Sequence, residues 1–208
     1  MIKVIIVDDH PVVRRGLKQI IEDEPDMQLA GEATNAGECF SLVRRMECSL
    51  VLLDISLPDR SGFDVLKQLK YERPELPVLI LSVHSEDQYG LRFIKAGASG
   101  YLMKEGAPEE LVKAIRKVNA GGKYVSASLA EKLVSHLDAS DKPPHENLSD
   151  REFQILCLIA GGKSLKDIAN ELCIGEKTVS TYRNRIMGKM KMSTNSDLTR
   201  YALENHLV

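Results

Sequence analysis

The chain has 208 residues, of which 43% are hydrophobic and 28% charged, and its formal net charge is −2. This composition is typical of a soluble protein with a packed core, and the length allows two ordinary domains. The net charge gives no indication that the chain as a whole binds nucleic acid or membranes. No apolar run approaches the length of a membrane span, and the start MIKVIIVDD lacks the apolar core of a signal peptide. We therefore expect a cytoplasmic protein. Its four cysteines are expected to be reduced and buried.

Residues 1–125 alternate between short aliphatic runs and stretches of helical period. The strand-like runs are 3–7, 27–31, 50–54, 78–83 and 100–103, and the helix-like stretches between and after them are 11–23, 36–46, 62–72, 87–96 and 108–120. This alternation predicts an α/β domain, a doubly wound five-stranded parallel sheet with helices on both faces. Binding sites in such sheets form outside the carboxyl ends of the strands.

Reactive side chains stand at those strand ends. Asp8 and Asp9 follow the first strand, Asp54 ends the third, Ser82 ends the fourth and Lys104 follows the fifth. Clustered carboxylates repel one another unless a cation lies between them, and oxygen ligands suit Mg²⁺. With a metal bound, Asp54 can act as a nucleophile that accepts a phosphoryl group, while Lys104 and Ser82 stabilise its oxygens.

The second half of the chain differs in pattern. A short helical pattern runs to Leu137, and the polar, proline-containing segment 138–146 predicts a flexible linker. From Leu148 onward there are only helical patterns, at 149–161, 164–173, 177–191 and 195–206. We therefore expect three parts, namely a domain at 1–125, a linker helix and flexible linker at 126–146, and a small all-α domain at 147–208.

The stretch 164–190 has the layout of a helix-turn-helix, in which Ile174-Gly175 is expected to turn the chain between the two helices. Residues 177–191 contain five basic side chains and no acidic one. A helix with such a surface suits the major groove of DNA, with cations on phosphates and smaller polar groups near base edges. The expected DNA contacts are Lys177, Thr178, Ser180, Thr181, Arg183, Asn184, Arg185 and Lys189.

The first domain resembles the receiver domains of bacterial two-component response regulators. The resemblance is carried by Asp8-Asp9, the run DISLPDRSG at 54–62, Ser82 and the run AGASGYLMK at 96–104. It covers about residues 1–125 and implies a flavodoxin-like fold. It also implies that a partner histidine kinase phosphorylates Asp54.

The same resemblance implies roles for further side chains. Mg²⁺ would be held by Asp9, Asp54 and the carbonyl of Ser56, with Asp8 assisting. Ser82 and Tyr101 would shift on phosphorylation and remodel the face made by the fourth helix and fifth strand. The nearby histidines, His10 and His84, are expected to be solvated loop residues.

The second domain resembles the LuxR-type output domain. This resemblance is carried by Leu148-Ser149-Asp150-Arg151-Glu152, Ile168-Ala169 and Lys177-Thr178-Val179. A receiver joined to it makes the NarL/FixJ class of response regulators. The run TVSTYRNR at 178–185, with Asp197-Leu198-Thr199, is similar to the global-regulator branch that includes GacA and UvrY. In this family the last helix, 195–206, often contributes to dimer contacts.

These resemblances imply a regulator of transcription rather than an enzyme. Phosphorylation of Asp54 is expected to favour a homodimer on promoter DNA. One alternative is a receiver that serves only as a phosphorylation-independent dimerisation scaffold. The other alternative is an aspartate-nucleophile phosphatase. Such enzymes have a DxD pattern, with a second aspartate two residues after the nucleophile, whereas this chain has Ser56 two residues after Asp54, which argues against this alternative.

Overall fold

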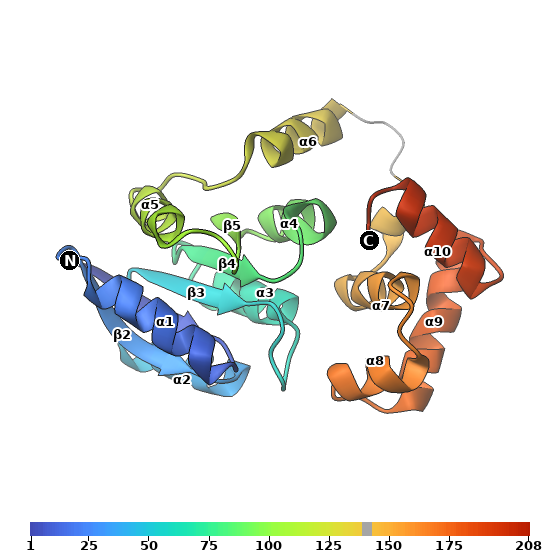
Figure 1. Ribbon diagram of the computed structural model, residues 1–208, viewed down its shortest axis with the longest axis horizontal. Coiled ribbons are helices and arrows are strands. Elements are labelled where there is room, and N and C mark those ends of the chain that lie inside the picture. The colour runs from blue at the N-terminus through green and yellow to red at the C-terminus, as the bar shows by residue number, and fades with distance from the viewer. Residues whose placement is uncertain (139–142) are drawn as a thin grey trace. The chain divides into compact units, whose positions relative to one another are not determined.

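Figure 1 shows the computed structural model of the chain. It describes the backbone of residues 1–138 and 143–208 and the side chains of residues 1–134 and 143–208. The chain divides into two compact units, a first unit of residues 1–132 and a second unit of residues 133–208. The first is an α/β sheet and the described part of the second is helical, which confirms the predicted fold class. None of the described helices combines the length and apolar character needed to cross a lipid bilayer.

The sheet of the first unit has five parallel strands in the order β2-β1-β3-β4-β5. The strands are β1 (Ile2–Val7), β2 (Met27–Ala33), β3 (Leu50–Asp54), β4 (Val78–Ser82) and β5 (Gly100–Met103). Val7 pairs with Leu53 in register, and Ser82 pairs with Met103. The carboxyl ends of β1 and β3 therefore meet at one edge, where the strand order switches.

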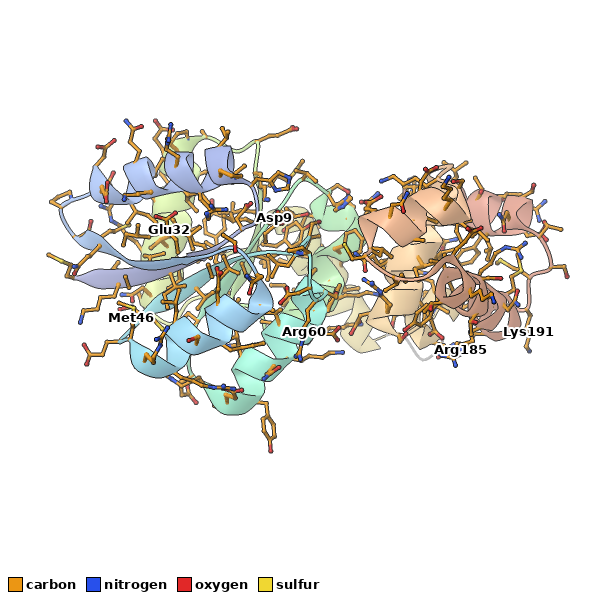
Figure 2. All side chains as sticks on the ribbon, turned by 90° about the horizontal axis from the view of Figure 1, so that it is seen from below. Asp9, Glu32, Met46, Arg60, Arg185 and Lys191 are labelled. Atoms are coloured by element: carbon orange, nitrogen blue, oxygen red, sulfur yellow. The ribbon has the colours of Figure 1, made fainter. Side chains whose placement is uncertain are left out.

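Helices cover both faces of this sheet. They are α1 (Pro11–Glu22), α2 (Ala36–Arg45), α3 (Gly62–Glu72), α4 (Glu86–Lys95) and α5 (Pro108–Asn119). Buried side chains of α1 and α5 share one core with alternate strand residues such as Val4 and Leu52. Figure 2 shows α2 and α3 on the opposite side of the sheet from α1. The Phe63 and Phe93 rings stack at 3.7 Å and join α3 to α4. Burial on both faces explains the uninterrupted apolar strands.

The segment after α5 is fastened to the first unit before α6 (Ala127–Asp138) begins. Tyr124 pairs with the edge of β5, since its amide donates to Ser99 and its carbonyl accepts from Tyr101. On α6, Leu129 is buried, and a Cβ added at Gly90 of α4 would lie 2.9 Å from Leu129 Cδ2. Gly90 presents no side chain to Leu129, so the start of the predicted linker helix packs closely on α4.

The second unit contains one 3₁₀ helix and four further α-helices among the described residues. They are η1 (Pro144–Asn147), α7 (Asp150–Ala160), α8 (Leu165–Glu171), α9 (Glu176–Met190) and α10 (Asn195–Glu204). The end of the predicted flexible linker is thus a 3₁₀ turn, whereas residues 139–142 lie outside the described part. The predicted strand and helix limits differ from the observed ones by no more than two residues. The three-part domain division stays a prediction.

The cysteines depart from the expectation that all are buried. Cys39 and Cys157 are buried, and burial raises the pKa of the Cys39 thiol to about 12. Cys48 is half-buried and Cys173 is exposed. Cys173 sits in an apolar sequence pattern, but it falls in the turn between α8 and α9, where its side chain leaves the core.

Candidate functional site

The polar strand ends of the first unit converge on one buried cluster. Lys104 Nζ lies 2.7 Å from Asp8 Oδ2 and 2.7 Å from Asp54 Oδ2. Asp8 is 1% exposed and Asp54 2%. The adjacency of β1 and β3 brings the two carboxylates together, and the turn after β5 brings the ammonium between them. The sequence predicted this convergence, but not that Lys104 bridges the two acids.

Burial and charge set the protonation of this cluster. Burial raises the pKa of Asp54, with a further contribution from Asp8, and outweighs the lowering effect of Lys104. For Lys104, burial disfavours the charged form, but the hydrogen bonds and charges of Asp54 and Asp8 outweigh it and raise its pKa. The ammonium is therefore firmly charged and holds two carboxylates that would otherwise repel each other.

The third carboxylate, Asp9, lies beside the bridged pair, and Figure 2 labels its position. Ligand atoms of Asp8, Asp9, His10 and Asp54 all lie within 4.8 Å of one another. Three carboxylates and one ammonium carry a net charge of −2, which a divalent cation balances. Carboxylate oxygens are also the ligands that Mg²⁺ prefers, so these residues fit the predicted ion.

His10 is more closely tied to this cluster than the sequence indicated. Its side chain is 62% exposed, but Nδ1 lies 2.7 Å from Asp9 Oδ1, and its amide donates to Asp8 Oδ1 at 2.8 Å. Arg14 adds a hydrogen bond from its guanidinium to the Asp8 carbonyl at 2.7 Å. A histidine directly after two aspartates was the only available signal, and it does not distinguish a loop residue from a partner of the acids.

Asp54 and Ser82 each accept a main-chain amide from the loop that follows their strand. The amide of Ser56 donates to Asp54 Oδ1 at 3.2 Å, so the loop after β3 begins folded against the carboxylate. Ser82 is fully buried, and its Oγ accepts the His84 amide at 2.9 Å. Ser82 therefore lies at the end of β4 as predicted, and its hydroxyl oxygen accepts a hydrogen bond within the loop that follows the strand.

Tyr101 of β5 is buried with its hydroxyl directed toward the loop after β4. The phenol donates to the His84 carbonyl at 2.9 Å, and burial raises the pKa of Tyr101. The His84 ring packs 5.2 Å from the Tyr89 ring of α4, so His84 is half-buried and not the solvated loop residue expected. One loop thus links β4, β5 and α4.

In the second unit, α8 and α9 form the predicted helix-turn-helix. Val179, Ile186 and Met190 of α9 are buried, with Ile168 and Ala169 of α8. Five of the predicted DNA contacts lie on the exposed side of α9 around Arg185, which Figure 2 labels, and a sixth, Ser180, is half-buried beside them. These five are Lys177, Thr178, Thr181, Asn184 and Arg185, and Lys189 is exposed as well.

The other two predicted contacts, Arg183 and Lys189, lie at the borders of the buried face of α9 and have partners within the second unit. Arg183 Nε donates to Asn195 Oδ1 at 2.6 Å, and Lys189 Nζ lies 2.6 Å from Glu152 Oε2. Glu152 is 3% exposed, and although burial disfavours its charge, the Lys189 contact and its capping hydrogen bonds to Ser149 lower its pKa. The Lys189 side chain is itself 43% exposed, so the pair is only partly buried and ties one end of α9 to the start of α7.

The turn between α8 and α9 is made by Cys173 rather than by the predicted Ile174-Gly175 pair. Cys173 has a φ of 50°, whereas Gly175 is the extended N-cap of α9. A left-handed conformation costs a side-chain-bearing residue about 1 kcal/mol. We expect Cys173→Gly to raise the free energy of unfolding of this unit by about 0.5 kcal/mol, because relief of the strain exceeds the entropy that glycine adds to the unfolded chain, and thermal unfolding measures it. Cys173→Ala, which keeps the strain, is the matched control and should show no such gain.

Comparisons with known proteins agree with both units. Residues 4–116 match the family described as response regulator receiver domain, and residues 146–202 match the bacterial regulatory proteins of the luxR family. The response regulator GacA of Pseudomonas aeruginosa is 35% identical over 210 residues, which cover 100% of this chain and 98% of GacA. The response regulator UvrY of Escherichia coli is 32% identical over 209 residues, covering 100% and 96% respectively.

Solved structures add a likeness over nearly the whole chain. RcsB from Salmonella enterica serovar Typhimurium, bound to promoter P1flhDC in the presence of the phosphomimetic BeF3−, is 25% identical with a TM-score of 0.67. The match covers 96% of this chain and 97% of that one. A second RcsB–DNA complex matches with a TM-score of 0.61 and 25% identity, covering 98% of each chain.

Proposed function

The chain belongs to the response regulators that join a receiver domain to a LuxR-type DNA-binding domain, and from this membership we propose that Asp54 is its phospho-acceptor. It is a DNA-binding two-component response regulator. In our proposal a histidine kinase donates the phosphoryl group, and the resulting phospho-aspartate favours a homodimer on double-stranded promoter DNA. A role on promoters also implies that the protein works in the cytoplasm.

The observation that carries the proposal is the position of Lys104, 2.7 Å from both Asp8 and Asp54. An isolated buried acid pair would be costly, and one ammonium for three carboxylates leaves a charge that suits a divalent metal. In this scheme Asp54 Oδ2 attacks the phosphorus of the kinase's phosphohistidine, the P–N bond breaks and the histidine side chain leaves, while Lys104 moves its hydrogen bonds toward the transferred oxygens. A solvated surface cluster would need no such arrangement.

We propose that Asp8, Asp9, Asp54 and the main-chain carbonyl of Ser56 hold Mg²⁺. When bound, the ion would neutralise developing negative charge on the phosphoryl oxygens. Asp54 keeps its orientation through the Ser56 amide, which donates to Oδ1 and leaves Oδ2 on the side of Lys104. Asp8 is held by the His10 amide in the same way.

Transmission of the signal would use the loop after β4. Ser82, now a partner of the His84 amide, would turn toward the phosphoryl group, and Tyr101 would lose or change its bond to the His84 carbonyl. Because that loop leads into α4, two receiver states with different α4 faces can exist, and phosphorylation shifts their populations. The proposed DNA contacts are Lys177, Thr178, Ser180, Thr181, Arg183, Asn184, Arg185 and Lys189. Of these, Arg183 and Lys189 also have partners within the second unit.

The test is to treat the full chain with acetyl phosphate, with and without Mg²⁺. Three readouts are intact-protein mass, molar mass in solution, and selection from a pool of random duplex DNA. We expect one Mg²⁺-dependent phosphoryl adduct, a shift from monomer toward dimer, and enrichment of paired half-sites by the phosphorylated sample.

The alternatives give different results in the same experiment. If the samples with and without Mg²⁺ contain the same fraction of dimer and select the same DNA, the receiver is a phosphorylation-independent scaffold. Sustained turnover of a phosphomonoester, with no accumulated adduct, would indicate a phosphatase. If acetyl phosphate gives no adduct, the experiment is repeated with a phosphorylated histidine kinase, and failure with both donors would overturn the proposal.

A further inference from the structure

The loop between β3 and α3, residues 55–61, carries one of the proposed metal ligands, Ser56. Its two ends are closed on each other, because the Gly62 amide donates to the Ile55 carbonyl at 3.1 Å and Ser56 pairs with Ser61 as a β-bridge. A Cβ added at Gly62 would lie 2.5 Å from the Ile55 Cα, so glycine is required for this approach. These contacts fix the base of the loop but not its tip.

The tip is held by Asp59, which reaches a different part of the first unit. Asp59 Oδ1 accepts the Ala36 amide at 2.9 Å, and Oδ2 lies 3.3 Å from the Gly37 amide that donates to it. Ala36 and Gly37 are the first two residues of α2, whose own cap Asn35 accepts only the Glu38 amide. A carboxylate at a helix N-terminus is favoured by both the unpaired amides and the helix dipole.

The segment 33–37 that receives Asp59 also holds the other side of the acidic cluster. The Asp8 amide donates to the Ala33 carbonyl at 3.1 Å. Hydrogen bonds therefore connect this one short segment to the strand end that carries Asp8 and to the loop that carries Ser56. Because Asp59 is exposed, its burial contributes little to stability, and it contributes to the fold through its hydrogen bonds to α2.

We propose that Asp59 is a positioning residue for the metal site. Its carboxylate holds the loop tip against α2 and so limits movement of the loop that carries Ser56, relative to Asp8 and Asp54 on the sheet. This inference rests on the proposed Mg²⁺-dependent function. Asp59 touches no reacting group, and it acts through the geometry of the ligands, as outer-shell partners of metal sites do.

The measurement is the dissociation constant for Mg²⁺, obtained by isothermal titration of the full chain, with thermal unfolding recorded without Mg²⁺. We expect Asp59→Ala to weaken Mg²⁺ binding about 10-fold, the lower end of the effect of losing an outer-shell partner. Asp59→Asn keeps one acceptor oxygen and should weaken binding about 3-fold. Asp23→Ala removes an exposed aspartate after α1 and should bind as the parent does.

Each outcome decides the question. If Asp59→Ala unfolds at a lower temperature but binds Mg²⁺ with the same dissociation constant as the parent, Asp59 is only a helix cap. That result would overturn the inference. If Asp59→Ala does not fold, Asp59→Asn decides, and a constant equal to the parent's counts against it. Absence of Mg²⁺ binding by the parent chain would instead refute the proposed metal site itself, so the two failures are distinguishable.

Discussion

Asp54→Asn is expected to abolish the phosphoryl adduct that acetyl phosphate and Mg²⁺ form on the parent chain. An amide oxygen is a poor nucleophile, and the substitution also removes one charge from the proposed metal site. The neighbouring carboxylate cannot replace it, because Asp8 already accepts from the His10 amide and Lys104. Intact-protein mass measures the result directly. Asp64→Asn makes the same chemical change at an exposed position on α3 and should be phosphorylated as the parent is.

Loss of the adduct must be separated from loss of the fold. Asp54→Asn should stay folded, since Lys104 keeps Asp8 as a partner. Because burial raises the folded-state pKa of Asp54 above 3.8, the parent should lose stability relative to the variant as the pH rises through that raised value without Mg²⁺. An adduct of the same size on folded Asp54→Asn would show that another residue accepts the phosphoryl group.

The architecture of the first unit was predictable because it depends on periodicity. A buried parallel strand must be apolar on both faces, so runs such as 50–54 stand out, and the helices between them keep a 3.6-residue period. The convergence of Asp8, Asp54, Ser82 and Lys104 then follows from parallel strands alone. It required no knowledge of which side chains bond to which.

Pairing between side chains was the part that one sequence could not supply. Lys189 looks like a member of the basic face of α9, but its ammonium lies against Glu152, 37 positions earlier in the chain. Asp59 similarly caps α2 from 23 residues away. Neither contact leaves a periodic signal, because each depends on how separate helices and loops pack after the chain has folded.

Local backbone geometry was also hidden in the second unit. Gly175 was the expected turn residue, since glycine adopts a positive φ at no steric cost. The observed left-handed residue is Cys173, and Gly175 has an ordinary extended φ of −70°. The Ile174 amide donates to the Ala169 carbonyl and closes the end of α8, and this local capping motif requires a left-handed residue at position 173.

The second large expected effect is on DNA. We expect the double substitution Lys177→Ala and Arg185→Ala to weaken binding to mixed-sequence duplex DNA about 100-fold, or roughly 1.4 kcal/mol for each side chain. Both side chains are exposed on α9, and neither has a carboxylate partner among the described residues of the second unit. Fluorescence polarisation over a range of salt concentrations is the measurement.

Salt dependence separates a DNA-binding surface from a general effect of charge. If Lys177 and Arg185 each neutralise a phosphate, the slope of log affinity against log salt concentration should become shallower by about 2. Lys3→Ala with Arg45→Ala removes the same two kinds of charge from the receiver and should leave that slope unchanged. If both double variants lose the same DNA affinity, the effect comes from the change in net charge. An unchanged slope in the α9 variant alone would mean that these side chains do not meet phosphates, and the reading surface of this protein would have to lie on another face of the second unit.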